Sequence, residues 1–146
     1  GDGPGRADIE ALGAELGLGG ALRLLGRRLD VPELLPGFDV GVLTSDSESF
    51  SNALLECMAA GLPVVSTDVG GCREALGESL AGIVVEPGRP GDVARGVLEL
   101  LGDPGRMAWA RKNHPERVRE AFSRQAYVRA YENLYGQLAG GGRAHA

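Results

Sequence analysis

The stretch Asp39–Gly71 reads DVGVLTSDSESFSNALLECMAAGLPVVSTDVGG, and it decides the fold. Its two apolar runs, Asp39–Leu43 and Pro63–Ser66, are too continuous for half-exposed strands and therefore predict buried strands. Between them, Asn52–Ala60 has the residues of a helix. A strand, a helix and a second strand in this order predict a parallel pair of strands joined by a crossover helix.

The predicted central helix carries a signal at each end, since Ser51 or Asn52 can serve as its N-cap and Gly61 occupies its C′ position. Further elements are predicted on both sides: a helix at 8–16, a strand-like block at 21–25, a helical turn at 32–35, a short helix at 72–76, a further buried strand at 82–85, and helices at 92–101, 106–121 and 125–138. We expect the helix at 106–121 to break at Pro115, because proline removes a hydrogen bond inside a helix.

This alternation predicts an α/β fold, a Rossmann-like, doubly wound parallel sheet with helices on both faces. We expect one domain over residues 1–139 and a flexible tail over 140–146, and we interpret the beginning at Gly1 as a sign that the chain is part of something longer. Because the carboxyl ends of parallel strands meet at one edge, any ligand is expected there.

The composition excludes several classes of protein. The chain has 146 residues, 15 basic against 20 acidic side chains, a net charge of −5 and 43% hydrophobic residues. An acidic chain of this kind lacks the basic face of a nucleic-acid binder, and its apolar fraction is too high for a disordered one. We therefore expect no nucleic-acid partner. No apolar run is long enough to cross a bilayer. We expect a cytoplasmic protein, because the opening residues do not resemble a signal peptide and the two cysteines have the surroundings of reduced thiols.

The residues that bind metals do not cluster in the sequence. His114 and His145 stand apart, and neither Cys57 nor Cys72 belongs to a metal-type spacing. We therefore predict no metal site and no cofactor, and we interpret both cysteines as reduced packing residues.

Two carboxylates, Glu48 and Glu56, stand on either side of the predicted helix start, with seven residues between them. The free N–H groups and positive dipole end of a helix favour a phosphate, and carboxylates accept hydrogen bonds from hydroxyl groups. This pattern suits a diphosphate that carries a sugar on each side, which describes a nucleotide sugar. The alternative interpretation is a solvated loop charge at Glu48 and a surface helix charge at Glu56.

The run Glu48–Gly71, followed by Glu74, resembles the signature of the retaining glycosyltransferases of GT-B fold, family 4. Their pattern is an E-x7-E motif with an aromatic residue after the first Glu, a helix and strand resembling LLEAMA-G-PVV, a D-x-GG turn and a further Glu. The turn Val84–Gly88 and the Phe122-Ser123 pair resemble later parts of the same family. The resemblance implies the C-terminal, donor-binding half of that fold, without its first strand and helix.

The resemblance also implies roles for the two carboxylates and the residues between them. Glu48 would be the catalytic residue that holds hydroxyls of the transferred sugar near the anomeric carbon, and Glu56 would accept hydrogen bonds from the ribose. Backbone N–H groups of four residues would seat the diphosphate: Phe50, Ser51, Asn52 and Ala53. Members of the family transfer sugars with retention and often need no metal.

Further binding residues are implied near the N-terminus. Gly3 lies in a segment that resembles the phosphate-side turn, and the turn from Gly26 to Val31, with Arg27, would touch the base of a UDP- or GDP-linked donor. Arg27, Arg28 and Arg73 could instead supply cations for the diphosphate or be solvated charges.

The resemblance also has departures and alternatives. Ser49 stands where the family often has glycine, and Arg124 replaces its usual tryptophan. The resemblance implies that the family's N-terminal acceptor domain is the partner of this chain and that the full-length protein makes peripheral contact with the inner face of the membrane. The resemblance implies glycan or glycolipid synthesis, such as cell-envelope polysaccharide. The alternatives are a stand-alone nucleotide-binding or interaction module without transferase activity and, last, an epimerase relative.

Overall fold

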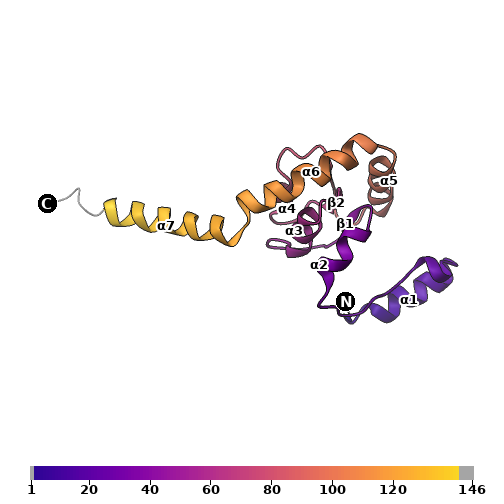
Figure 1. The fold of residues 1–146 in the computed structure, drawn as a ribbon. Helices are drawn as coiled ribbons and strands as arrows, with labels where there is room; N and C mark the ends of the chain where they lie inside the picture. The colour runs from indigo at the N-terminus through magenta and orange to yellow at the C-terminus, as the bar shows by residue number, and fades with distance from the viewer. Residues whose placement is uncertain (1, 142–146) are drawn as a thin grey trace. The chain divides into compact units, whose positions relative to one another are not determined.

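The computed structural model describes residues 2–141, and Figure 1 traces their helices and strands. These residues divide into two compact units, with the boundary between Glu33 and Leu34. That boundary falls inside the short helix α2 (Val31–Leu34), the turn predicted near Pro32. Residues 142–146, most of the tail predicted for 140–146, lie outside the described residues.

The first unit contains α1 (Arg6–Glu15) and a 3₁₀ turn, η1 (Gly19–Ala21). The predicted helix is confirmed, and Gly17 follows it with a φ of +65°, a conformation that favours glycine. The predicted strand at 21–25 is wrong, because within the described part of the unit these residues pair with no neighbouring strand. Leu22 has the φ and ψ of a strand, −93° and 122°, but an extended segment becomes a strand only through ladder hydrogen bonds.

The second unit is built on three parallel strands in the order β1 (Gly41–Leu43), β2 (Val64–Thr67) and β3 (Gly82–Val85). Every residue of β2 is buried, as expected for the middle strand. The predicted full burial of the other two strands is wrong. Val42 in β1 is 48% exposed and β3 is half-buried along its length. Each of these strands pairs with β2 alone among the described residues, so each forms an edge of the sheet.

Helices cover both faces of this sheet, as the sequence predicts. On one face, α3 (Asn52–Ala59) and α4 (Cys72–Leu76) pack with Val64 in a buried cluster. On the other face lies α5 (Pro90–Leu101), and a Cβ added to its Gly96 would meet Ile83 at 3.2 Å and Val65 at 3.3 Å. Glycine at this position lets α5 approach the sheet closely.

The last two helices of the second unit, both labelled in Figure 1, are α6 (Pro104–Ala121) and α7 (Arg124–Gly141). Each has 18 residues. The predicted break at Pro115 is wrong, because α6 continues through it. α6 packs against α3, and we attribute the continuation of the helix through the proline to this packing. Backbone atoms of Arg111 would lie 3.0 Å from a Cβ on Gly61, and the His114 side chain is completely buried. A second 3₁₀ turn, η2 (Leu35–Gly37), precedes β1.

Candidate functional site

The candidate site lies at the carboxyl ends of β1 and β2, the edge where parallel sheets bind ligands. The β1–α3 loop, residues 44–51, joins β1 to α3 and carries Glu48. The Thr67 hydroxyl, at the end of β2, donates to the Ser45 carbonyl over 2.6 Å, and the Ser45 hydroxyl donates to Glu48 Oε1 over 3.0 Å. Two successive hydrogen bonds therefore tie the Glu48 carboxylate to the central strand.

Gly70 and Gly71 allow the turn after β2 to press against the β1–α3 loop. Gly70 has a φ of +50°, and a Cβ there would lie 2.1 Å from the Glu48 carbonyl oxygen. The Gly71 N–H donates to the Ser49 carbonyl over 3.0 Å. Glycine is therefore required at position 70 both for the backbone angle and for the space, and the D-x-GG turn serves as a support for the loop.

The helix α3 begins where the sequence predicts, with Ser51 as its N-cap. The buried Ser51 hydroxyl accepts from the Leu54 N–H over 3.4 Å. The N–H groups of Asn52 and Ala53 belong to the first turn, where no intrahelical acceptor exists, and both residues are exposed. This helix start therefore offers N–H donors and a positive dipole end to an anion.

The two glutamates of the motif have different surroundings. Glu48 is half-buried and hydrogen-bonded to Ser45, whereas Glu56 is exposed on α3 one turn beyond the helix start. Burial, and next the charge of Glu56, raise the pKa of the Cys57 thiol. Cys57 and the buried Cys72 are both free thiols packed in the cluster below α3, which confirms the prediction of packing residues.

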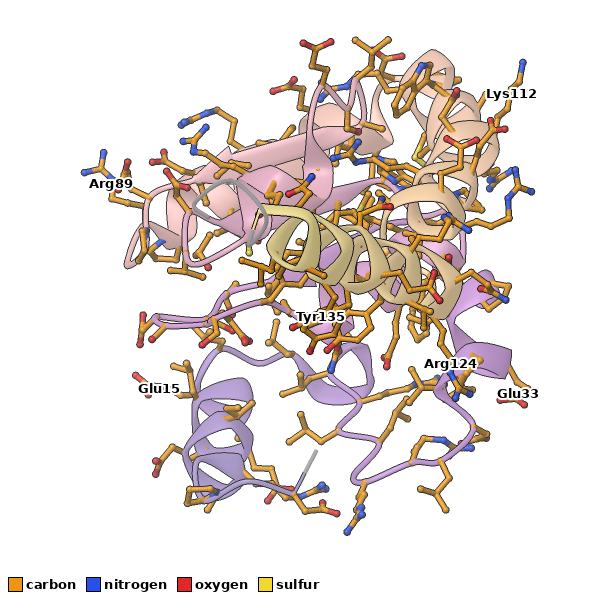
Figure 2. All side chains as sticks on the ribbon, turned by 90° about the vertical axis from the view of Figure 1, so that its left-hand side faces the viewer. Glu15, Glu33, Arg89, Lys112, Arg124 and Tyr135 are labelled. Atoms are coloured by element: carbon orange, nitrogen blue, oxygen red, sulfur yellow. The ribbon has the colours of Figure 1, made fainter. Side chains whose placement is uncertain are left out.

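A cavity of about 300 Å³ at the same edge was not predicted from the sequence. Its lining comes from three segments that follow strands: Thr44, Asp46, Thr67, Gly88, Arg89, Pro90 and Val93. Arg89, which points outward in Figure 2, forms an ion pair with Asp92, as does Arg95. Hydrogen bonds from Arg95 and then Arg89 lower the pKa of Asp92. The sequence feature that could have predicted this cavity is the position of its lining segments, each of which lies at the carboxyl end of a strand.

Two of the three arginines that the sequence offers as cations for a diphosphate, Arg28 and Arg73, are paired with carboxylates. Arg73 makes two hydrogen bonds to Asp68, at 2.8 Å and 2.6 Å, and these raise the pKa of its guanidinium. Arg28 forms the same kind of pair with Asp30. Both pairs lie at the protein surface, in agreement with the interpretation of these arginines as solvated charges, and the phosphate-binding alternative stays a prediction.

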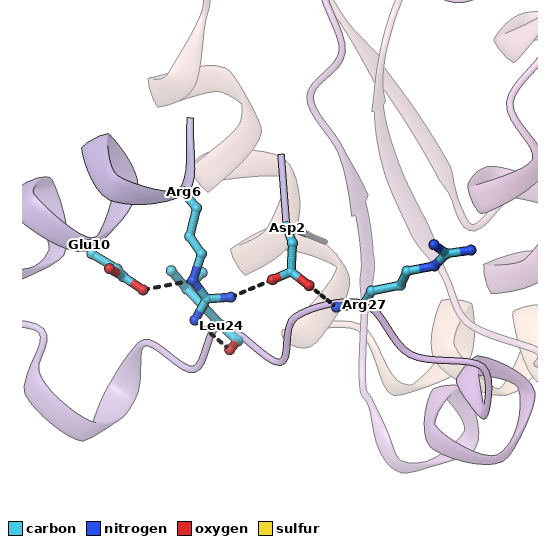
Figure 3. Close-up of polar contacts among 5 residues, drawn as sticks. All are labelled: Asp2, Arg6, Glu10, Leu24 and Arg27. Carbon is cyan, nitrogen blue, oxygen red and sulfur yellow. Dashed lines mark hydrogen bonds and ion pairs between the residues drawn. The ribbon is translucent and has the colours of Figure 1, made fainter. Parts of the chain in front are cut away.

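Two of the predicted N-terminal residues, Gly26 and Arg27, contact Asp2, and Figure 3 shows the polar contacts of Arg27 and Asp2. The Asp2 carboxylate accepts from the Arg27 N–H over 2.8 Å and from the Arg6 guanidinium over 3.0 Å. The Arg27 bond is the main cause that lowers the pKa of Asp2. Gly26, with a φ of +70°, completes this turn, and a Cβ there would lie 3.1 Å from the same carboxylate.

The remaining two residues predicted near the N-terminus also belong to the first unit. The Gly3 carbonyl accepts from the Arg6 N–H, and Val31 is the first residue of α2. The structure therefore brings Glu48, Phe50, Ser51, Asn52, Ala53 and Glu56 together in one unit, whereas Gly3, Gly26, Arg27 and Val31 belong to another.

Clusters of metal ligands and membrane spans are absent from the described residues, 2–141. In the part of the chain that the structure describes, no three His, Cys, Asp or Glu side chains gather as metal ligands would. Between residues 2 and 141, none of the helices combines the length and apolar character needed to cross a bilayer.

Comparison with known proteins identifies the family. Residues 1–103 match the family described as glycosyl transferases group 1. This chain belongs to the group 1 glycosyl transferases. Among curated members, N-acetyl-alpha-D-glucosaminyl L-malate synthase of Bacillus anthracis is 35% identical over 135 residues, which are 92% of this chain and 35% of the synthase.

Solved structures agree with that assignment. Sucrose-phosphate synthase of Thermosynechococcus elongatus has a TM-score of 0.80 and 31% identity, over 97% of this chain and 36% of the synthase. Anabaena HepE, solved in complex with UDP and glucose, has a TM-score of 0.78 and 25% identity, over 91% of this chain and 36% of HepE. The chain therefore spans about a third of the length of these relatives. Its expected fold, one α/β half of a GT-B glycosyltransferase, is confirmed.

Proposed function

We propose that this chain is the donor-binding half of a retaining, family 4 glycosyltransferase. It would bind a nucleotide-diphosphate sugar, from which the whole enzyme moves the sugar to an acceptor in glycan or glycolipid synthesis. Membership of the group 1 glycosyl transferases and the UDP complex of the related HepE support this proposal. The observation that carries it is the β1–α3 loop, in which Glu48 is tied to β2 through Ser45 and which leads into the exposed first turn of α3 at Asn52 and Ala53.

Each part of this loop has a chemical role in the proposal. The N-terminus of α3, through the backbone N–H groups of residues 50–53, binds the diphosphate and stabilises the negative charge that develops when the sugar leaves. The exposed Glu56 accepts hydrogen bonds from the ribose hydroxyls. Glu48, whose carboxylate is already oriented by Ser45, holds hydroxyls of the transferred sugar near the anomeric carbon.

The N-terminal unit contributes the base and phosphate contacts in this proposal. Gly26, Arg27 and Val31 would touch the base, and Gly3 would lie beside the phosphates. We propose that residues 1–139 form one nucleotide-sugar-binding domain that works with a separate acceptor domain, because the chain spans about a third of its relatives. We place the whole enzyme in the cytoplasm, at the inner face of the membrane, in cell-envelope polysaccharide synthesis.

Calorimetric titration of the purified chain with UDP and with GDP tests donor binding. We expect weak binding of one of them and a loss of roughly tenfold in affinity for Glu56→Ala, because a charge-assisted hydrogen bond to ribose is lost. Glu120→Ala is the control, since it removes the same charge from an exposed position on α6. Equal affinities for the Glu56 and Glu120 variants would contradict the ribose assignment.

A second titration separates the two glutamates. We expect Glu48→Ala to weaken binding of the complete nucleotide sugar by roughly threefold and to change the affinity for the bare nucleotide less. A larger loss for the bare nucleotide would show that Glu48 does not contact the sugar.

We also expect no turnover from this chain alone. Measurable sugar transfer by the purified chain would disprove the need for an acceptor domain.

A further inference from the structure

We propose that Phe122 and Arg117, at the end of α6, are positioning residues for the β1–α3 loop, an inference that rests on the proposed function because it treats this loop as the donor site. Neither residue belongs to the Glu48–Glu56 motif. Both lie more than 60 residues further along the chain than that motif, and they reach the loop only through the fold.

Phe50 is the point of contact between this pair and the loop. Its ring lies 5.4 Å from the ring of Phe122, centroid to centroid, at an interplanar angle of 46°. On the other element that it touches, a Cβ on Gly71 would lie 2.3 Å from the Phe50 ring. Phe50 is therefore held by the D-x-GG turn and by the end of α6, and it precedes the Ser51 cap directly.

Arg117 fixes Phe122 and α4 together. Its guanidinium lies over the Phe122 ring, 5.7 Å from the centroid, in the arrangement of a cation–π contact. Its Nε and one terminal nitrogen donate to the carbonyls of Ala75 and Glu74, each over 2.6 Å. These carbonyls belong to the last turn of α4, where helices lack intrahelical donors, so Arg117 caps that helix.

These contacts connect the end of α6 to the N–H groups that the donor would use. Because α4 begins directly after Gly71, capping α4 from Arg117 and packing Phe122 on Phe50 hold both sides of the β1–α3 loop. A loop held in its binding conformation loses less conformational freedom when the ligand binds. Without the Phe122 ring, the free β1–α3 loop would be less ordered. Donor binding would then have to order the loop, and this entropy cost would lower the affinity.

The test compares Phe122→Leu with two controls. Phe122→Tyr keeps the ring, and Leu100→Val removes buried volume from α5, outside the cluster that contains Phe50 and Phe122. We would record the backbone amide resonances of residues 49–53 in the free chain and the affinity for UDP by calorimetry. Arg117→Gln serves as a second variant where Phe122→Leu does not fold.

We expect Phe122→Leu to shift the resonances of residues 49–53 and to weaken UDP binding by about fivefold. We expect Phe122→Tyr and Leu100→Val to leave both unchanged in the folded protein, although Leu100→Val lowers the melting temperature. The doubly substituted Phe50→Leu, Phe122→Leu chain should lose less affinity than the sum of the losses in the two single variants, because the contact that the two rings share is lost only once.

Two results would overturn the proposal: unchanged loop resonances in Phe122→Leu, or an equal effect of Leu100→Val. If the unaltered chain binds neither UDP nor GDP, donor binding by this chain is disproved, whereas the resonance comparison still decides whether Phe122 positions the loop. The two ideas therefore fail on different measurements.

Discussion

The helices α6 and α7 follow one another, have 18 residues each, and differ in what covers them. In α6, Ala110 and His114 are completely buried. In α7, the residues 124–139 include no buried side chain, although the sequence has an apolar stripe of Tyr127, Tyr131, Leu134, Tyr135 and Leu138. Although α6 is the more polar of the two helices, it is the better packed one, because other segments of the chain pack against it.

The anchor of α6 is a histidine that bonds to two different loops. Its Nδ1 lies 2.7 Å from the Leu62 carbonyl, which can only accept, so Nδ1 carries the proton. Its Nε2 therefore accepts from the Ser79 hydroxyl over 2.6 Å. In α7, by contrast, the tyrosines pack on one another, with ring centroids 4.6 Å and 6.0 Å apart, and Tyr135 is 63% exposed (Figure 2).

The largest effect is expected from His114→Ala. It removes a buried ring and leaves the Leu62 carbonyl and Ser79 hydroxyl without their partner, so we expect a loss of about 3 kcal/mol in the free energy of unfolding. Urea denaturation measures this change. Lys112→Ala, at an exposed position of α6 (Figure 2), is the control and should change stability little. A loss below about 1 kcal/mol would show that His114 is not the anchor.

An intermediate effect is expected from pH, through the same residue. Burial, assisted by the charge of Arg117 and opposed by the hydrogen bond to Leu62, lowers the pKa of His114 in the folded state. The unfolded chain therefore takes up a proton first as the pH falls below about 6.5, and stability decreases by at most about 1.4 kcal/mol per pH unit.

Urea denaturation between pH 7.5 and about 5 measures this effect. The carboxyl groups of Asp2, Asp30 and Asp92, whose pKa values are lowered, take up protons only below this range. His114→Gln should flatten the dependence, because it cannot gain a proton. An equal slope in this variant would assign the pH dependence to another group.

The smallest effect is expected from Tyr131→Ala in α7. Because the side chain is 43% exposed and contacts the neighbouring tyrosines of its own helix, the loss should be below about 0.5 kcal/mol. The same urea experiment applies, with His114→Ala for comparison. A loss above about 2 kcal/mol would mean that α7 is packed as firmly as α6 and would remove the difference between the two helices.

Much of the second unit could be predicted from the sequence because local signals and tertiary contacts agree there. Three local signals within Glu48–Gly71 agree with the structure. The start of α3 is at Ser51, the glycine that follows this helix is Gly61, and the buried strand contains Val64–Ser66. The expected order of strand, helix and strand follows from these signals. The two glutamates also lie where the helix start predicts them, on the loop and one turn inside α3.

The errors arise where the outcome depends on neighbours that periodicity does not describe. Val42 has the sequence of a buried strand but lies on an edge, and Leu22 is extended without a partner. Pro115 stays inside α6 because packing on α3 outweighs the local preference. The cavity near Thr44 and Arg89 was missed because its lining joins three segments that are separate in the sequence and meet only in the fold.

The close approach at Gly70 has a consequence for any attempt to diversify this protein. A Cβ at position 70 would collide with the backbone of Glu48 and Ser49, which cannot move without displacing the loop, whereas Asn52 is exposed at the helix start. In a library randomised at both codons and selected for folded protein, position 70 should return glycine alone while position 52 returns many residues. The close approach of the turn after β2 to the β1–α3 loop therefore depends on glycine at one position of the chain, Gly70.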